Sequence, residues 1–209
     1  MGEPILIYGK SGSGKSRSLL NFGEEEIFLV NVIGKRLPFP KKFKYTSTFD
    51  DVEKIKTALR AMVDKSAAKA AVIDDAGYLM TNLFMRSHGK GDQYALYNEI
   101  ADSMWGLVNF VKNDLPEDIL VYIVMHEDVS DLGESKLRTL GKLLDSKVSL
   151  EGMVTICLRS AIVGGKHVFL TNSNGSDICK SPEGLFNDEM IPNDLKAIDS
   201  RIREYWGIK

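Results

Sequence analysis

The sequence predicts an α/β fold in which a mainly parallel sheet is flanked by helices, with a C-terminal β-hairpin at one edge of the sheet. Short apolar runs alternate with amphipathic stretches, and a glycine-rich loop directly follows the first apolar run. Residues 161–171 have the pattern of a hairpin that turns at Gly164-Gly165. No linker or internal repeat interrupts the 209 residues, so we expect one domain over 1–209.

The first predicted element is a strand over residues 5–8, and a phosphate-binding motif follows it. The pattern G-x-x-x-x-G-K-[ST] is matched by Gly9, Lys10, Ser11, Gly12, Ser13, Gly14, Lys15 and Ser16. Glycines let backbone N–H groups approach an anion closely, and a helix expected to run to about residue 22 adds positive potential at its start. Lys15 is expected to reach the β- and γ-phosphates, and the Ser16 hydroxyl to ligate Mg²⁺. The motif therefore predicts a site for a nucleoside triphosphate.

Composition limits the classes of protein to which the chain can belong. Apolar residues make up 44% and charged residues 27%, and the net charge of −2 provides no global basic field for nucleic acid. Cys157 and Cys179 form no C-x-x-C pair, which favours free thiols over a disulfide or a zinc site. No apolar run reaches the ~18 residues of a membrane span, and the phosphate loop leaves no room for a signal peptide. We therefore expect a cytoplasmic protein without a membrane partner.

A second strand is predicted over residues 27–32, and a basic loop follows it. Residues 34–45 contain five basic residues, two prolines, Phe39, Phe43 and Tyr45, and no acidic residue. This mixture suits a loop that follows a phosphate backbone and stacks on bases. It also suits a solvated surface loop with aromatic anchors, and charge patterning alone slightly favours the solvated loop.

A helix is predicted to open at residues 48–51, with Thr48 or Asp50 as its cap, and to run to about residue 64. An apolar strand at residues 70–73 then leads into two acids. A carboxylate at the carboxyl end of a strand can hold Mg²⁺ beside the serine of a phosphate loop, so Asp74 is the predicted metal-side acid. Asp75 stands where many ATPases with such a phosphate loop carry a glutamate that polarises the attacking water. Its shorter side chain leaves that role open.

The second half of the chain is predicted to complete the sheet. Residues 81–93 are expected to form a mobile loop, residues 94–113 a helix, and residues 119–125 a buried strand. His126 and Glu127 follow that strand, where open α/β sheets bind ligands, and are expected to sense the γ-phosphate or its water. A fifth strand at 153–158, the hairpin and a last helix at 193–206 follow.

The strands that end in Asp74 and His126, the charged loops after them and the late hairpin resemble a RecA-like P-loop NTPase core. Nearly the whole chain resembles small phage-encoded ATP-binding proteins of recombination and replication modules, some of which are single-strand annealing proteins. The resemblance implies ATP and Mg²⁺ as cofactors, single-stranded DNA as a partner and a homo-oligomer. It also implies other phage replication or recombination proteins as partners, and the host cytoplasm as location.

Carried over by position, the resemblance implies DNA-contacting loops at residues 85–93 and 129–143. It also implies a basic residue acting on a neighbouring subunit's site, for which Arg159 and Lys166 are the candidates.

The chain departs from the RecA-like pattern at one position. Such cores usually carry a catalytic glutamate at the end of the strand after the phosphate loop, and this chain has Asn31 or Val32 there. Hydrolysis would then depend on Asp75 or Glu127, with Lys15 and His126 as the other expected catalytic residues, and would be slow. A non-enzymatic module that binds ATP and anneals or scaffolds DNA therefore stays open.

A nucleotide-kinase-like phosphotransferase is a third possibility, disfavoured because such enzymes carry an arginine-rich lid. Arg86 is the one arginine between Arg60 and Arg138.

Overall fold

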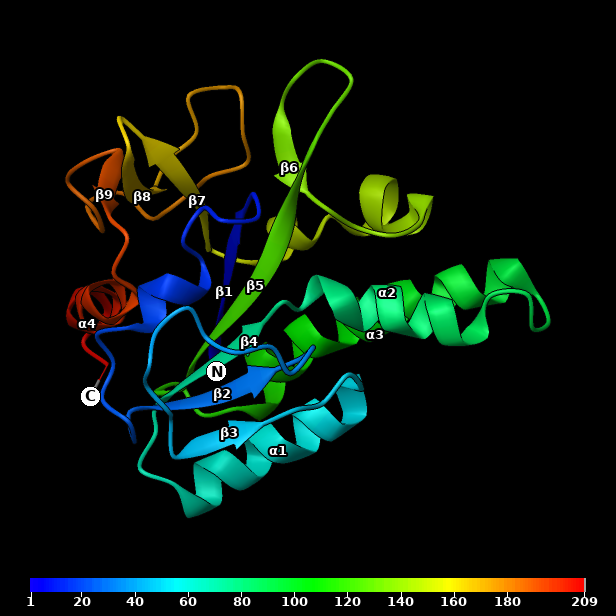
Figure 1. Ribbon diagram of the computed structural model, residues 1–209, viewed down its shortest axis with the longest axis horizontal. Coiled ribbons are helices and arrows are strands. Elements are labelled where there is room, and N and C mark those ends of the chain that lie inside the picture. The colour runs from blue at the N-terminus through cyan, green and yellow to red at the C-terminus, as the bar shows by residue number, and fades with distance from the viewer. Residues whose placement is uncertain (209) are drawn as a thin grey trace.

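One continuous sheet forms the centre of the molecule (Figure 1). The structure is a computed structural model that describes residues 1–208, apart from the side chains of residues 145 and 146; Lys209, the last residue of the expected domain, lies outside the described residues. Its strands are β1 (Glu3–Gly9), β2 (Ile27–Asn31), β3 (Tyr45–Ser47), β4 (Ala70–Asp74), β5 (Leu120–Val129), β6 (Ser135–Leu137), β7 (Ile156–Val163), β8 (Lys166–Leu170) and β9 (Met190–Pro192).

The strand order is β3-β2-β4-β5-β1-β7-β8-β9, with β6 paired to β5. The neighbouring strands β3, β2, β4, β5, β1 and β7 are parallel to one another. Strands β8 and β9 pair antiparallel at one edge, and β6 pairs antiparallel with β5. The predicted α/β class is therefore confirmed: the sheet is mainly parallel, helices flank it, and a late hairpin lies toward one edge. Residues Gly164 and Gly165 have positive φ angles of 57° and 77°, as the tight hairpin turn requires.

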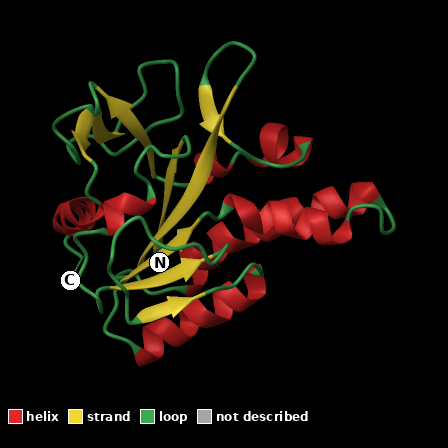
Figure 2. Ribbon diagram, viewed as in Figure 1, coloured by secondary structure: helices red, strands yellow, loops and turns green. Residues whose placement is uncertain are grey.

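Helices cover both faces of the sheet (Figure 2). They are α1 (Val52–Lys65), α2 (Gly77–Ser87), α3 (Gln93–Asp114) and α4 (Leu195–Trp206), with 3₁₀ turns at Ser16–Leu19 and Leu150–Met153 and a π turn at Leu144–Val148. Apolar residues of α1, α2 and α3 share one core with alternate residues of the central strands. The other residues of those strands pack with Leu19, Phe22 and α4. Because both faces are covered, the central parallel strands are almost entirely apolar, which is the pattern read from the sequence.

The segment after the phosphate loop corrects one expectation. The helix expected to run to residue 22 is a single 3₁₀ turn, Ser16–Leu19. The Ser18 hydroxyl donates to the Lys15 carbonyl oxygen at 2.6 Å, so this side chain competes with the backbone bonds that would extend a helix. Leu19 and Phe22 still reach the core from the turns that follow.

Three other boundaries also differ from those predicted. Residues 77–87 form α2, so the expected mobile stretch at 81–93 shrinks to the connection at 88–92. Strand β5 continues to Val129 and folds back through β6, which places His126 and Glu127 inside a strand. The fifth strand begins at Ile156, three residues later than expected, and runs without a break into the hairpin. Tertiary pairing extends these strands beyond their apolar centres.

Candidate functional site

The carboxyl ends of four parallel strands bring the predicted polar residues to one edge of the sheet. The register places Gly9 of β1 opposite His126 of β5, and Asn31 of β2 opposite Asp74 of β4. The phosphate loop leaves β1 at this edge, where an open α/β sheet binds its ligands. The site is therefore built where the strand order predicts one.

The phosphate loop holds its lysine against its own backbone. The Lys15 ammonium donates to the carbonyl oxygens of Gly9 and Lys10, both at 2.8 Å. Burial lowers the pKa of Lys15, while the carboxylates of Asp75 and Asp74 oppose that shift. A buried ammonium satisfied only by carbonyl dipoles is poised to exchange these contacts for an anion.

The back of the loop is held by residues from the far end of the chain. The Ser13 carbonyl oxygen accepts hydrogen bonds from Ser160 Oγ of β7 at 3.0 Å and from His167 Nδ1 of β8 at 2.7 Å. A carbonyl only accepts, so His167 carries its proton on Nδ1 in this contact. Because a trans peptide points its C=O and N–H in opposite directions, the Gly14 N–H is turned away from these two donors.

This close support explains two of the glycines. A Cβ on Gly9 would lie 2.3 Å from the Ser160 carbonyl oxygen, and one on Gly14 would lie 2.9 Å from His167 Nδ1. Gly14 also has a positive φ of 108°, which side chains disfavour. His167 was not anticipated, because a histidine in a hairpin gives no sequence signal of a contact with a loop about 150 residues earlier.

Ser16 and Asp74 meet as the metal-side pair. Ser16 Oγ donates to Asp74 Oδ2 at 2.8 Å, and Asp74 Oδ1 has no hydrogen-bond partner although the residue is 1% exposed. Burial raises the pKa of Asp74, and the neighbouring Asp75 carboxylate raises it further. A hydroxyl beside a carboxylate with an unpartnered oxygen suits Mg²⁺, which prefers oxygen ligands and takes the rest from phosphates and water.

The residues present therefore fit this ion as part of a nucleotide complex. Within residues 1–208, no group of three or more histidine, cysteine or acidic side chains could hold a metal without such help.

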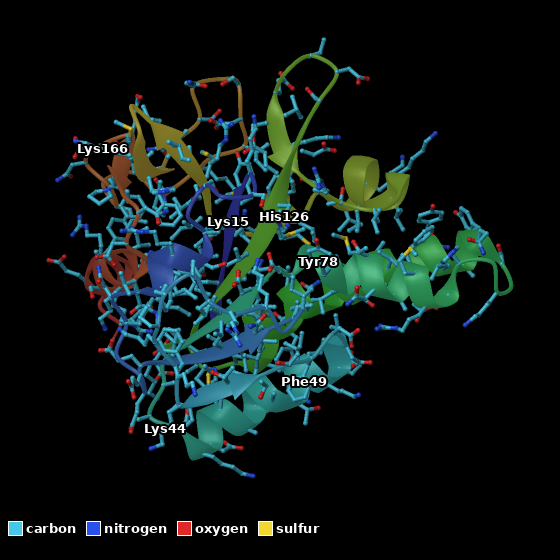
Figure 3. The ribbon with its side chains drawn as sticks, in the orientation of Figure 1. Lys15, Lys44, Phe49, Tyr78, His126 and Lys166 are labelled. Atoms are coloured by element: carbon cyan, nitrogen blue, oxygen red, sulfur yellow. The ribbon has the colours of Figure 1, made fainter. Side chains whose placement is uncertain are left out.

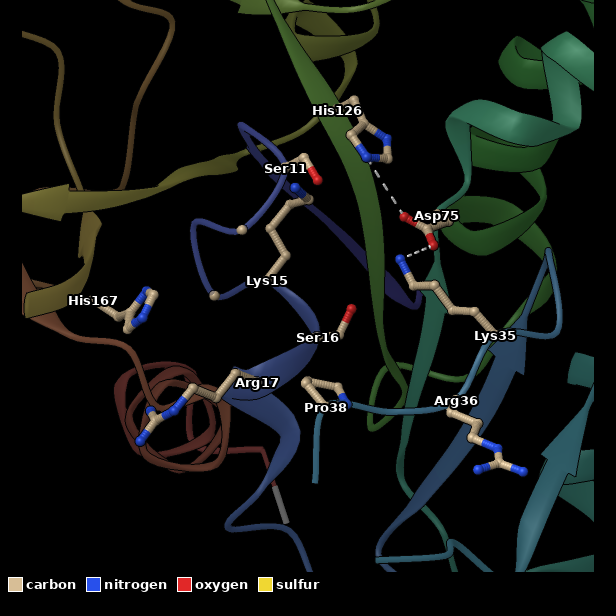
Figure 4. A pocket seen from close by; sticks show the side chains of 12 residues that line it. Ser11, Lys15, Ser16, Arg17, Lys35, Arg36, Pro38, Asp75, His126 and His167 are labelled. Atoms are coloured by element: carbon tan, nitrogen blue, oxygen red, sulfur yellow. Dashed lines mark ion pairs between the residues drawn. The ribbon is translucent and has the colours of Figure 1, made fainter. Parts of the chain in front are cut away.

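Asp75 sits next to the metal-side acid in a strained backbone conformation. Its φ is +59°, which aspartate tolerates better than most residues. Its carboxylate pairs with Lys35 from the turn after β2, and Oδ1 lies 3.8 Å from His126 Nε2 (Figure 4). Burial lowers the pKa of His126, with Lys15 adding to the effect, so its imidazole is neutral at neutral pH.

Asn31 is the last residue of β2 and, with Val32, one of the two positions where the resemblance would place a catalytic glutamate. Asn31 Nδ2 donates to the Lys35 carbonyl oxygen at 2.6 Å, and its Oδ1 has no partner. The amide therefore ties the turn that carries Lys35 to the end of β2. A glutamate could not donate this hydrogen bond.

These groups surround one cavity of about 340 Å³. Its lining consists of Ser11, Gly12, Gly14, Lys15, Ser16, Arg17, Lys35, Arg36, Pro38, Asp75, His126 and His167. In Figure 4, Lys35, Asp75 and His126 lie on one side of Lys15, and Arg17 and His167 lie on the other. Most predicted site residues are thus brought together, with Lys35, Arg36 and His167 added by the fold.

Glu127 does not line this cavity, contrary to the expectation that it faces the γ-phosphate. Neighbouring residues of a strand point to opposite faces, and Glu127 pairs with Arg159 at 2.7 Å on the face opposite His126. Arg159 also lies 3.9 Å from Asp177. An arginine engaged within its own subunit is poorly suited to reach a neighbour's site, whereas Lys166 lies exposed at the hairpin turn (Figure 3).

The basic loop and the two implied DNA loops are placed as follows. Phe43 is buried in the core, and Lys41 donates to the carbonyl oxygens of Leu20 and Phe22 at 2.5 and 2.8 Å, so part of the basic loop is an anchor. The segment 85–93 contains the end of α2 and the connection to α3, and 129–143 contains β6. Leu132, at the turn between β5 and β6, is 87% exposed.

The remaining sequence expectations concern thiols and membranes. Cys157 and Cys179 are both free and buried, as the sequence predicts. Among residues 1–208, none of the helices combines the length and the apolar character needed to span a bilayer.

Comparisons with known proteins assign no function to this chain. No protein-family model matches the chain, and no curated protein matches it significantly. Among solved structures, the chain is similar to a KaiC-like protein of the hyperthermophilic archaeon Pyrococcus horikoshii OT3. The two are 14% identical over 80% of this chain and 76% of the other, with a TM-score of 0.47. With so few identical residues, function has to be argued from the site itself.

Proposed function

We propose that this chain is a RecA-like ATPase that binds ATP with Mg²⁺ and hydrolyses it. The observation that carries this proposal is the placement of Lys15 and Ser16 in one cavity of about 340 Å³, with Asp74 hydrogen-bonded to Ser16 behind its lining. A phosphate loop alone predicts an anion site. A hydroxyl and a carboxylate positioned beside it add the ligands that Mg²⁺ needs when a triphosphate is bound.

The roles of the residues follow from their positions. The Lys15 ammonium leaves the carbonyl oxygens of its own loop for the phosphates, and Ser16 and Asp74 supply oxygen ligands for the metal. When bound, Mg²⁺ neutralises charge that develops on the phosphates during transfer. The Asp75 carboxylate lines the cavity and is our candidate to accept a proton from an attacking water, and His126 stands neutral beside it.

The orientation of the nucleotide follows from the same geometry. In Figure 4, Ser16 lies on the same side of Lys15 as Asp75 and Lys35, and Asp74 is hydrogen-bonded to Ser16, so we place the terminal phosphate on that side. The nucleoside then extends toward Arg17 and His167.

A turnover assay tests this proposal. The wild type should release phosphate from ATP in a Mg²⁺-dependent reaction, and Lys15→Ala should lower the rate roughly 100-fold or more, since a charge-stabilising donor is lost. Lys54→Gln on α1, an equal loss of charge at an exposed position outside the site, should leave the rate unchanged. Equal rates in the wild type and Lys15→Ala would overturn the assignment.

A non-enzymatic ATP-binding module is the alternative that a specific observation favours. Asn31 replaces the usual glutamate, and Asp75 is already engaged by Lys35. Tight Mg²⁺-dependent ATP binding with phosphate release no faster than buffer would select this alternative. Phosphate release that requires an added nucleoside or nucleotide would instead point to a phosphotransferase.

Single-stranded DNA is the partner we propose for this ATPase. A second cavity of about 870 Å³ shares Arg36 with the phosphate cavity, and its lining has no acidic residue. Lys42 and Phe39 line it beside the anchoring residues Lys41 and Phe43. Such a basic, partly aromatic surface suits a phosphate backbone and its bases. The wider role in phage recombination or replication, as a homo-oligomer with other proteins of such a module, rests on the family resemblance alone.

DNA binding is tested by fluorescence anisotropy with labelled single strands across a salt series. The affinity should fall steeply with salt, with a slope that counts the neutralised phosphates. Arg36→Gln combined with Lys42→Gln should weaken binding and reduce that slope by about 1 to 2. Binding that is insensitive to both substitutions, or ATP turnover indifferent to added DNA, would remove DNA from the proposal.

A further inference from the structure

Lys35 lies on the side of the phosphate cavity where a terminal phosphate would arrive. It lines that cavity together with Lys15, Ser16 and Asp75, and it comes from the turn after β2, outside the phosphate loop. Its positive charge is close enough to lower the pKa of His126 and to oppose the upward shift in the pKa of Asp74. It is therefore a second cation in the site, which the loop motif does not supply.

The ion pair between Lys35 and Asp75 is asymmetric. The Asp75 side chain is 1% exposed and held in a strained backbone, whereas the Lys35 side chain is 43% exposed. A lysine stem with four rotatable carbons can swing toward another anion in the same cavity, while the carboxylate cannot follow it. The pair is thus built to open from the lysine side.

The backbone of Lys35 is held by hydrogen bonds that do not involve its ammonium group. Asn31 Nδ2 donates to the Lys35 carbonyl oxygen at 2.6 Å, and the turn closes with a hydrogen bond from the Gly34 N–H to the Asn31 carbonyl oxygen at 3.2 Å. The backbone of Lys35 is therefore fixed at the edge of the sheet, so an exchange of partners requires only its side chain to move.

We propose that Lys35 reads the terminal phosphate of the bound nucleotide, exchanging its ion pair with Asp75 for that phosphate and thereby releasing the Asp75 carboxylate. This inference rests on the proposed ATP site and adds a device for distinguishing ATP from ADP. The γ-phosphate offers more negative charge than one carboxylate and is absent from ADP. In the released state, Asp75 keeps His126 beside it and can accept a hydrogen bond from water.

The proposed exchange also explains why an amide side chain stands at position 31. With the lysine acting from the same subunit, the site needs a side chain that donates to the Lys35 backbone, and an amide can donate where a glutamate cannot. Asn31 in place of a glutamate thus holds the backbone of the lysine that lines the cavity.

The test measures the affinity of the full chain for a non-hydrolysable ATP analogue and for ADP, both with Mg²⁺, by isothermal titration calorimetry. The wild type should prefer the ATP analogue. The Lys35→Gln variant should bind the ATP analogue roughly tenfold more weakly than the wild type, since one charge-assisted contact with the terminal phosphate is lost. Its affinity for ADP should equal that of the wild type. Lys54→Gln, with the same loss of charge on α1, should change neither affinity.

A double-mutant cycle separates an exchange of partners from simple electrostatics. Asp75→Asn should raise the affinity for the ATP analogue, because Lys35 no longer has to leave a carboxylate, and asparagine tolerates the positive φ. In the Lys35→Gln background the same substitution should raise it by a smaller factor. Equal factors in both backgrounds would overturn the exchange, as would a Lys35→Gln variant that keeps the wild-type preference.

The outcomes distinguish this inference from the proposed function. A wild type that binds neither nucleotide overturns both, whereas one that binds the ATP analogue and ADP equally overturns the inference alone. Lys35→Gln leaves the buried Asp75 carboxylate unpaired, so its folding is checked by circular dichroism. If that variant does not fold, Lys35→Gln combined with Asp75→Asn carries the test, since no unpaired charge remains. Its affinity for the analogue must then fall well below that of Asp75→Asn.

Discussion

The carboxyl group of Asp74 is buried beside the carboxyl group of Asp75, and one of its oxygens has no hydrogen-bond partner. Burial and the neighbouring charge raise its pKa in the folded protein above the ordinary value of 3.8. The folded state therefore holds a proton on Asp74 more tightly than the unfolded chain does. It follows that the contribution of this residue to stability is fully present below its unfolded pKa and is lost as the pH rises through the raised folded pKa.

Asp74→Asn should therefore stabilise the nucleotide-free protein at neutral pH, by about 1 kcal/mol, although it removes a proposed metal ligand. The gain should be larger at pH 8 than at pH 5, because only the ionised carboxylate is penalised by burial. Urea unfolding at the two pH values measures both effects. Asp102→Asn, at an exposed position on α3, is the matched control and should leave the stability nearly unchanged. A variant less stable than the wild type at pH 8 would contradict this account of Asp74.

The hairpin formed by β7 and β8 supports the phosphate loop from behind. Ser160 and His167 both donate to the Ser13 carbonyl oxygen, which turns the Gly14 N–H the opposite way. An element predicted only as an edge extension of the sheet therefore acts on the site. Its side chains hold the backbone of a loop that belongs to the first strand of the chain.

His167→Ala should weaken the binding of ATP and ADP alike, by about 2- to 10-fold, since one hydrogen bond that orients the loop is lost. An effect shared by both nucleotides separates this positioning role from that of Lys35. Titration calorimetry gives both affinities, and partial recovery is expected in His167→Gln, whose amide can also donate. Ile162→Thr, at the position paired with His167 across the hairpin, tests whether general disturbance of the hairpin is sufficient. If Ile162→Thr weakens binding as much as His167→Ala does, the hydrogen bond is not the cause.

In the molecule as a whole, the site is assembled from four strands that are far apart in sequence. The phosphate loop follows β1, Asp74 ends β4, His126 lies in β5, and His167 lies in β8. A ligand that contacts all of them ties together both halves of the chain. Nucleotide binding should therefore stabilise the molecule as one unit.

Mg²⁺ with nucleotide at 100 times its dissociation constant should stabilise the fold by about 2.7 kcal/mol, which corresponds to a rise in Tm of roughly 5 to 11 °C for a chain of this size. Thermal unfolding with and without MgADP measures the rise. Lys15→Ala should reduce it, and Mg²⁺ alone should produce little change. A wild type whose Tm responds to no nucleotide would argue against the site.

Much of this arrangement was readable from local spacing. The phosphate loop, the acid that ends β4 and the turn of the late hairpin were predicted at their observed places, and the strands β1, β2, β4, β5 and β7 within a few residues of theirs. The order of the parallel strands brings their carboxyl ends to one edge, so Asp74, Asp75 and His126 were correctly expected to lie near the loop.

Other features depend on contacts between distant segments, and local sequence does not encode those contacts. Glu127 was assigned to the site because it follows an apolar run, but β5 continues through it, and the alternation of a strand turns it to the opposite face, toward Arg159. Lys35 and His167 stand in segments without a catalytic pattern and enter the cavity only because β2 and β8 lie where the sheet places them.

There is a physical reason why some features could be predicted from the sequence and others could be found only in the fold. A phosphate loop and a buried strand are specified by residues a few positions apart, because backbone conformation and hydrophobic period are local properties. The partner of a buried charge or carbonyl is chosen by strand order and register, which join residues such as Ser13 and His167 only after the chain has folded. The nucleotide site could thus be located from the motif, whereas the residues that support the loop and engage Asp75 had to be found in the fold.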